Sequence, residues 1–190
     1  MVENWEDKIY FVRGGYKMDR IILIRPNKSL EQQAISYKKE HFDYGENTIN
    51  GSEMWDKTES YDEWLKEITN NTDIKTVNPY WVVTDTFFAI REIDYKIIGI
   101  IDFRHELNDF LKDFGHIGYS VRPSERKKGY ATEMLKQLLE IARQTGLSEV
   151  HLSCEKENIP SIKTILKNGA SYERSFLFED KEANVYVVRL

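Results

Sequence analysis

Cysteine, long apolar runs and an export signal are what this sequence has least of. Its single cysteine, Cys154, excludes an internal disulfide and a cysteine-based metal cluster, and we expect no metal site. No apolar run reaches the roughly 18 residues that a membrane span needs. The opening segment MVENWEDKIYFVRGG lacks the basic start and apolar stretch of a secretion signal. We therefore expect a cytoplasmic protein that does not enter a membrane.

Positive charge is also in deficit. The 190 residues include 27 Lys and Arg against 32 Asp and Glu, which gives a formal net charge of -5. Domains that bind nucleic acid usually have the opposite balance, so we expect no nucleic-acid partner. The length suits one core better than two, and the chain shows no repeat and no clear linker. These features predict a single domain over 1–190, either alone or as a homodimer.

The start of the chain has two interpretations. The glycine pair Gly14-Gly15 favours a hairpin turn, whereas Met18 could be the natural start, which would make residues 1–17 an N-terminal extension.

Beyond this point, strand patterns and helix patterns are interspersed. Strands are expected over 20–26, in two stretches of 86–107 joined near Asp94-Tyr95, and over 115–121, 149–154 and 171–190. Helices are expected after Ser29 and after Ser60, each with a capping box, then over 129–145 and from Asn158 to Gly169. Residues 43–59 are polar and predict a long surface loop. An antiparallel first half followed by a strand–helix–strand–helix unit indicates an α/β fold.

The segment from 121 to 146 concentrates positive charge in an otherwise acidic chain. Four basic residues stand just before Gly129: Arg122, Arg126, Lys127 and Lys128. The first turn of a helix leaves backbone N–H groups without partners, and the helix dipole adds positive charge there. Gly129 has no side chain to block an approaching ligand. The segment therefore predicts a site for a phosphate or a diphosphate, although such a loop can also be a plain solvated surface.

Two motifs in this half of the chain resemble those of the GNAT family, the acyl-CoA-dependent N-acetyltransferases. The family's diphosphate signature, Q/R-x-x-G-x-G/A, is matched by Arg126, Gly129 and Ala131 between a strand and a long helix. NIPSIKTILKNGASYE resembles a later motif, in which an asparagine precedes a helix that ends in K-x-G. GHIGYSVRPSERKKGYATEML is similar to the branch that acetylates ribosomal-protein N-termini and to its uncharacterised bacterial relatives. The resemblance covers 80–190 well and 18–80 loosely.

The resemblance implies a fold and a cofactor site. The fold would be a central mixed, mostly antiparallel sheet with a splayed parallel strand pair and helices on both faces. Acetyl-CoA would be the co-substrate, and the backbone N–H of Val121 or a neighbour would meet its thioester carbonyl. Asn158 lies near the pantetheine or adenosine side, or is only a helix cap. The residues expected to bind CoA are Ser120, Val121, Arg126, Lys127, Lys128, Gly129, Tyr130, Ala131, Thr132, Asn158 and Ser161.

Acetyl transfer to an amine raises a proton problem. A lysine-like amine, with a pKa of about 10.4, costs about 4 kcal/mol to neutralise near pH 7.4, whereas an α-amine costs less than about 1 kcal/mol. The candidates for a general base are His116, at the start of the strand GHIGYSV, and His105 and Glu106 just after the preceding strand. Many family members place a tyrosine seven residues after the asparagine. Here that position is Ile165, which puts the usual general acid in doubt.

The acceptor is expected to be a small-molecule or peptide amine. A pocket for a cationic amine could be lined by Trp55, Trp64, Glu53, Asp56 and Asp62, although Trp64 is better explained as an anchor for its helix. Cys154 fits a buried strand residue better than an acyl carrier. Two alternatives to a transferase stay open: a GNAT-like module that senses acyl-CoA without turnover, and a basic scaffold that binds another anion or a protein.

Overall fold

The computed structural model describes residues 18–190, so the hairpin predicted at Gly14-Gly15 and the extension over 1–17 lie outside the described residues. The strands are β1 (Ile21–Ile24), β2 (Thr84–Arg91), β3 (Ile97–Arg104), β4 (Tyr119–Val121), β5 (Glu149–Glu155), β6 (Ser171–Phe178) and β7 (Lys181–Arg189). The helices are α1 (Glu31–Asp43), α2 (Tyr61–Asn70), α3 (Tyr130–Arg143) and α4 (Ile159–Lys167), with 3-10 turns η1 (Lys28–Leu30) and η2 (Pro123–Glu125). None of the helices in this part of the chain has the length and apolar character to cross a bilayer.

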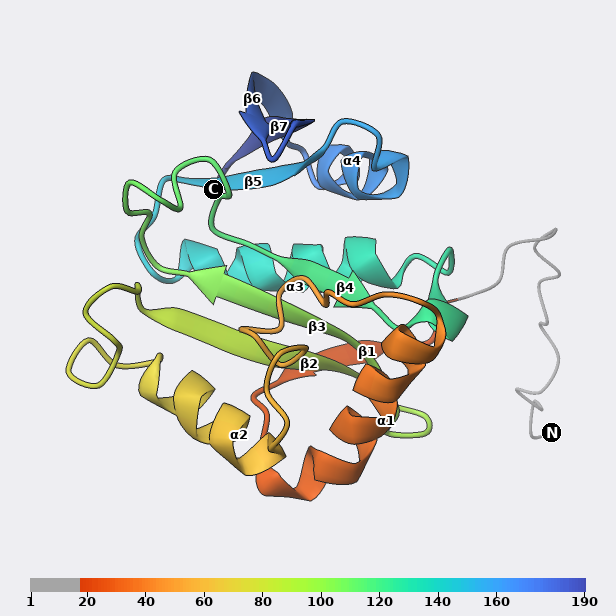
Figure 1. Cartoon of the computed structure of the whole chain (residues 1–190). Helices are drawn as coiled ribbons and strands as arrows, with labels where there is room; N and C mark the ends of the chain where they lie inside the picture. The colour runs from red at the N-terminus through yellow and green to blue at the C-terminus, as the bar shows by residue number, and fades with distance from the viewer. Residues whose placement is uncertain (1–17) are drawn as a thin grey trace, which may run out of the picture.

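The strands form two sheets where one central sheet was predicted. The first has the order β1-β2-β3-β4 and the second β5-β7-β6, and all neighbours within each are antiparallel. β4 and β5 are connected through α3 and run in the same direction (Figure 1). In the described residues no ladder pairs β4 with β5, and the segment that leads into β4 contacts β5 at an isolated bridge between Gly115 and Leu152. The expected splayed pair is therefore present, and its separation divides the sheet in two.

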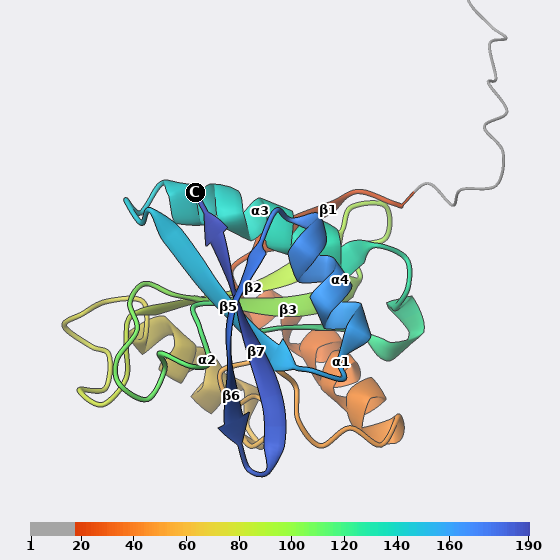
Figure 2. The same ribbon diagram turned by 90° about the horizontal axis from the view of Figure 1, so that it is seen from above.

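Helices cover both faces of the four-stranded sheet (Figures 1 and 2). On one face, Ile98 and Ile101 of β3 pack in a core with α3. On the other, Phe88 and Ile100 pack in a core with α1 and α2. Because both faces are covered, β2 and β3 are buried along almost their whole length instead of at alternate residues. The predicted α/β fold class is confirmed.

The helix after Gly129 has the predicted apolar face. Five of its stripe residues are fully buried in the core: Met134, Leu135, Leu138, Leu139 and Ala142. Ala131 and Ile141 lie at the margin of the stripe and are partly buried. This helix is thus held rigidly against β3 and β4, which fixes the position of its N-terminus.

Helix starts follow the sequence prediction in two of the three cases that the structure tests. The Ser60 hydroxyl accepts from the Glu63 N–H over 3.3 Å, and the Asn158 side chain accepts from the Ser161 N–H over 3.2 Å. The capping box predicted at Ser29 is wrong. Asn27 caps η1, and the Ser29 hydroxyl donates to it over 2.6 Å. Because a 3-10 turn precedes α1, the helical segment starts two residues earlier than predicted.

Candidate functional site

β4 and β5 separate next to His116. The His116 N–H donates to the carbonyl oxygen of His151 over 2.7 Å, and the His151 N–H donates to Nδ1 of His116 over 3.0 Å. The two rings stack with centroids 5.7 Å apart. The His116 carbonyl accepts from the Arg104 N–H of β3 over 2.8 Å. The imidazole therefore fills the point where the strands diverge. From there β4 and β5 separate toward the N-terminus of α3 (Figure 1), and we call the space between these two strands the gap.

The free edge of β4 presents backbone N–H groups to this gap. On the opposite edge, the Gly118 carbonyl accepts from β3 over 3.0 Å and the Arg122 N–H donates to β3 over 2.7 Å. Hydrogen-bonding direction alternates along a strand, so the N–H groups of Tyr119 and Val121 point away from β3 and into the gap. Ser120 belongs to the β3 side, where its carbonyl also accepts from the Tyr37 hydroxyl over 3.0 Å.

The gap leads to five consecutive backbone N–H groups at the start of α3. From Lys127 to Ala131, none has an acceptor within residues 18–190. The Thr132 N–H donates to the Gly129 carbonyl over 3.1 Å. Thr132 was predicted to bind CoA, but its backbone donor is therefore not free. Gly129 has a φ of 92°, and a Cβ built there would meet only the Met18 sulfur, at 3.5 Å. Such an open row of amides at a helix start is a physical match for an anion.

Two of the cations predicted to bind phosphate are held by carboxylates. Arg126 makes two hydrogen bonds to Glu46, of 2.5 and 2.7 Å, and Lys128 lies 2.8 Å from Glu125. Lys127 is exposed, with a φ of 62°, and has no ion-pair partner within the described part of the chain. The basic segment therefore serves mainly to fix the loop, and the groups left available to an anion are the backbone amides and Lys127.

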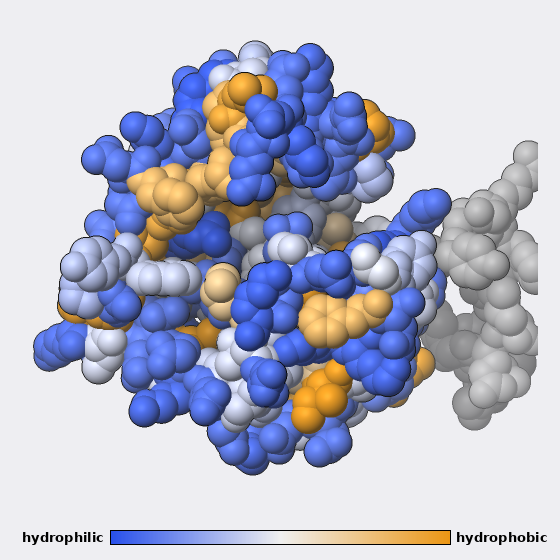
Figure 3. Space-filling view, viewed as in Figure 1, coloured by the Kyte–Doolittle hydropathy of each residue, from blue (hydrophilic) through white to orange (hydrophobic). Residues whose placement is uncertain are grey.

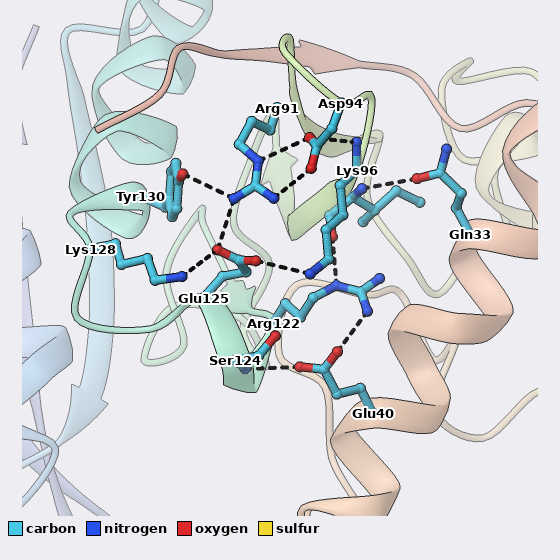
Figure 4. Close-up of polar contacts among 11 residues, drawn as sticks. Gln33, Glu40, Arg91, Asp94, Lys96, Arg122, Ser124, Glu125, Lys128 and Tyr130 are labelled. Atoms are coloured by element: carbon cyan, nitrogen blue, oxygen red, sulfur yellow. Dashed lines mark hydrogen bonds and ion pairs between the residues drawn. The ribbon is translucent and has the colours of Figure 1, made fainter. Parts of the chain in front are cut away.

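Glu125 is the centre of the network that fixes this loop (Figure 4). Its carboxylate accepts from Arg91, Lys96 and Lys128 over 2.8 to 2.9 Å. Burial alone would raise the pKa of Glu125, but the hydrogen bonds from the two lysines and the charges around it hold that pKa at about 2. The loop is thereby tied to the β2–β3 hairpin.

Arg122 ties the same loop to α1 (Figure 4). Its side chain is 4% exposed, donates to Glu40 over 2.7 Å and reaches the Ile97 carbonyl over 2.7 Å. The Ser124 N–H donates to Glu40 over 2.8 Å. Burial opposes ionisation of Glu40, but these hydrogen bonds outweigh it and lower its pKa to about 2. Arg122 and Lys128, two of the four basic residues before Gly129, therefore have a structural role: they hold the loop in place.

Three polar side chains from β4, β5 and the start of α4 lie close together. The Tyr119 hydroxyl from β4 lies 2.8 Å from the Ser161 hydroxyl at the start of α4. Cys154 of β5 is half-buried beside Ser161, and burial raises the pKa of its thiol. Burial also raises the pKa of Tyr119 to about 12, so its hydroxyl stays neutral. Tyr119 was missed as a site residue, although its spacing from Ile117 and Val121 places all three side chains on one face of the strand.

The residue at the usual tyrosine position contributes no polar group. Ile165 is fully buried in the core beneath α4. Asn158 caps α4 through its side-chain oxygen, as one of its two interpretations required. The hydroxyl pair of Tyr119 and Ser161 joins β4 to the start of α4 instead.

The three candidates for a general base do not converge. His116 uses its Nδ1 lone pair to accept from His151, and burial lowers its pKa to about 4, so it is neutral at pH 7. The His105 side chain is 33% exposed, contacts Asp85 over 3.0 Å and packs its ring against Phe103. Glu106 is exposed. These positions favour structural roles for the two histidines.

The cationic pocket predicted from the loop after α1 is not formed by its tryptophans. Trp55 and Trp64 are each 1% exposed and pack together in the core beneath α1 and α2, as was favoured for Trp64 but not for Trp55. Asp62 is used by Lys28, at 2.6 Å, on the outer surface. Asp56 is nearly buried and accepts from Ser52 over 3.1 Å.

Glu53 is buried beside β3 instead of lining an open pocket. Its side chain is 4% exposed, lies 3.7 Å from Arg104 and accepts from Asn71 over 3.3 Å. Burial and the negative charge of Asp102 raise the pKa of Glu53 to about 8, so the carboxyl is neutral at pH 7. A neutral carboxyl in this position supplies no attraction for a cation.

The loop after α1 nevertheless forms one lip of the gap. Gly51 packs so closely on β4 that an added Cβ would lie 2.3 Å from the Gly118 carbonyl oxygen. The space-filling view shows a hollow between this lower part and the β5–β7 part above it (Figure 3). Since α3 and α4 cover the other side, the hollow is the open approach to the gap. Over residues 18–190, no group of three or more His, Cys, Asp or Glu side chains is placed to hold a metal ion.

Comparison with known proteins agrees with this geometry. Residues 22–171 match the family model described as acetyltransferase (GNAT) domain. The uncharacterised N-acetyltransferase YjdG of Bacillus subtilis (strain 168) is 29% identical over 87 residues, which cover 45% of this chain and 50% of YjdG, so the match spans only about half of that relative.

Two solved structures share the fold at low identity. RimL, the ribosomal L7/L12 alpha-N-protein acetyltransferase, in complex with coenzyme A, has a TM-score of 0.64 at 15% identity and covers 90% of this chain and 94% of its own. The microcin C7 self-immunity acetyltransferase MccE, in complex with acetyl-CoA and AMP, has a TM-score of 0.65 at 16% identity and covers 94% and 98%.

Proposed function

The chain belongs to the GNAT acetyltransferase family, and from this premise we propose that it transfers the acetyl group of acetyl-CoA to a primary amine by direct attack in a ternary complex. One observation carries the proposal: acceptor-free amides from Lys127 to Ala131 stand at one end of a gap that is edged by β4. CoA has a diphosphate followed by an extended arm, and the site offers partners for both in that order. A cytoplasmic location and a bacterial source belong to the same proposal.

Different parts of the site bind the diphosphate and the extended arm of CoA. The amides from Lys127 to Ala131, with the charge of Lys127, hold the diphosphate, and Gly129 lets it approach the backbone. The arm pairs with the free edge of β4 and passes Ser161 on the other wall. Neither Arg126 nor Lys128 needs to leave its carboxylate for this mode of binding.

In the reaction, the N–H of Val121 or Tyr119 donates to the thioester oxygen as it becomes an oxyanion. The amine nitrogen forms a bond to the carbonyl carbon, and the bond from carbon to sulfur breaks. The Ser161 and Tyr119 hydroxyls stabilise the departing thiolate by hydrogen bonds, and a thiol pKa of about 8.5 lets it leave without full protonation. The amine's proton passes to water in the hollow.

This scheme uses no side chain as an obligatory base. His116, His105 and Glu106 remain candidates for a lesser role, but the lone pair of His116 is engaged and the His105 ring contacts Asp85. An amine with a pKa near 8 is neutral often enough that the cost is below about 1 kcal/mol. The site therefore suits an amine that is less basic than a lysine side chain.

A second function has one observation in its favour. Ile165 fills the usual tyrosine position with a buried apolar group, which suits a module that binds acyl-CoA without turnover. Such a module would show the same CoA affinity and no thiol release.

A panel of amines with acetyl-CoA and a thiol-release readout tests the proposal. A transferase gives amine-dependent release, and kcat/KM increases with pH as the acceptor's own ammonium group deprotonates. Calorimetric CoA binding without release for any amine would identify the sensor instead. Absence of saturable CoA binding would reject both functions.

A further inference from the structure

Resting on the proposed function, we infer that the acceptor is a primary amine with an aromatic or bulky aliphatic group close to its nitrogen. The inference comes from an apolar strip beside the hollow, which we call the phenylalanine strip. Its members are Phe110 and Phe114 of the β3–β4 connection and Phe176 and Phe178 of the β6–β7 hairpin.

The strip is assembled from two segments far apart in sequence. Phe114 is its centre, with ring centroids 5.1 Å from Phe110, 6.0 Å from Phe176 and 4.9 Å from Phe178. Its outer members are exposed: Phe110 is 70% and Phe178 43% accessible. A contiguous exposed apolar surface of this kind is typical of a binding site more than of a solvated face.

The strip begins at the reaction gap. Phe114 stands two residues before His116, where β4 and β5 diverge, and its carbonyl accepts from the Ser153 hydroxyl over 2.9 Å. Phe176 lies in register with Ala183, and Ala183 with Glu155, the residue after Cys154. Figure 3 shows apolar surface running from the β3–β4 connection up to the β6–β7 hairpin, above the hollow. A group attached near the reacting nitrogen would therefore contact it.

Unpaired negative charge surrounds the strip. Four carboxylates on the same two segments have no ion-pair partner within residues 18–190: Glu106, Asp109, Glu179 and Asp180. Two of the bases nearby are engaged, since Arg174 pairs with Asp113 over 2.9 Å and Lys181 with Glu155 over 2.8 Å. Lys112 is exposed between Phe110 and Phe114 without an ion-pair partner in residues 18–190, so the carboxylates leave the surface with an excess of negative charge. An ammonium ion with an apolar group complements this surface in both charge and polarity.

The test compares acceptors and one pair of variants. Phenethylamine and ethylamine are assayed by thiol release, and each kcat/KM is divided by the neutral fraction of the amine at the assay pH, because the two amines differ in basicity. The tetrapeptide amides Phe-Ala-Ala-Ala and Ala-Ala-Ala-Ala are treated in the same way and distinguish a free amine from a peptide N-terminus. We expect kcat/KM for the aromatic member of a pair to exceed that of its partner by at least tenfold, since apolar contacts in a pocket discriminate by about 10- to 200-fold. Phe110→Ala should lower this ratio by about tenfold. Ile93→Ala, 79% exposed at the distant β2–β3 turn, should leave the ratio unchanged.

Each outcome decides the inference separately from the proposed function. Thiol release with equal rates for aromatic and small amines would overturn the inference and keep the transferase. If no amine is turned over, phenethylamine binding to the CoA complex is measured by calorimetry, and binding no tighter than that of ethylamine would overturn it. Loss of a dimer in Phe110→Ala by light scattering, with the ratio unchanged, would assign the strip to a second copy of the chain instead.

Discussion

Individual carboxylates, more than the cations beside them, explain how the loop before α3 is held. Glu125 binds three basic groups, Glu40 binds Arg122 and the Ser124 amide, and Glu46 binds Arg126. Each acid comes from outside the row of amides, so the amides stay free while the residues on either side of them are fixed. A preformed loop lowers the ordering cost that ligand binding would otherwise incur.

The Glu125 network predicts a specific acid response. The pKa of Glu125 is about 2 in the fold and near 4.3 in an unfolded chain, so its stabilising contribution is complete above about pH 5 and is lost as pH falls toward 2. The free energy of unfolding should therefore decrease between pH 6 and pH 2.5 by about 1–3 kcal/mol more in the wild type than in Glu125→Gln. Urea unfolding at a series of pH values measures this difference.

The control for that experiment is Glu140→Gln, because Glu140 pairs with Arg143 on the exposed side of α3. This variant should follow the wild-type pH curve. Parallel curves for the wild type and Glu125→Gln would contradict the role given to Glu125.

At the scale of elements, the start of α3 and the free edge of β4 determine where a bound ligand would lie. α3 begins without a side-chain cap, which leaves its first amides available, whereas α2 and α4 are capped by Ser60 and Asn158. An uncapped start is tolerated because the apolar face of α3 is fully buried. The exposed amides are thus supported by packing further along the helix.

The corrected start of the first helical segment gives a second prediction. Asn27→Ala should lower the free energy of unfolding by about 1 kcal/mol, since it removes the group that accepts from the Ser29 amide and hydroxyl. Ser29→Ala keeps the Asn27 cap and should lower it by less than about 0.5 kcal/mol. Thermal and urea unfolding of the two variants measure the difference, and a larger effect of Ser29→Ala would restore the original capping box.

Local patterns sufficed for most elements but not for their long-range partners. The strand and helix positions, the Gly129 turn and the buried stripe of α3 follow from periodicity and from glycine. The pairing of Arg126 with Glu46, and the burial of Trp55, depend on contacts over many residues that no spacing rule contains. For the same reason, the meeting of Tyr119 with Ser161 across the gap became visible only in the structure.

For the molecule as a whole, the central feature is a sheet divided between β4 and β5, with helices behind the division and a hollow in front of it. A ligand in the gap would contact both sheets and the start of α3 at once. Binding of such a ligand to the folded state alone stabilises it, by about 2.7 kcal/mol at 100 times Kd. The proposed transferase function therefore depends on whether CoA binds in this gap through the amides at Gly129.

Calorimetric CoA affinity of Gly129→Ala and Gly146→Ala tests this claim most directly. Both glycines have left-handed backbones, with φ of 92° and 85°, and neither has a close neighbour that a methyl group would strike. Their losses of stability should therefore be similar, about 1–2 kcal/mol. We predict that Kd for CoA rises at least about tenfold, or about 1.4 kcal/mol, in Gly129→Ala and stays at the wild-type value in Gly146→Ala. Equal affinities in the two variants would contradict the account.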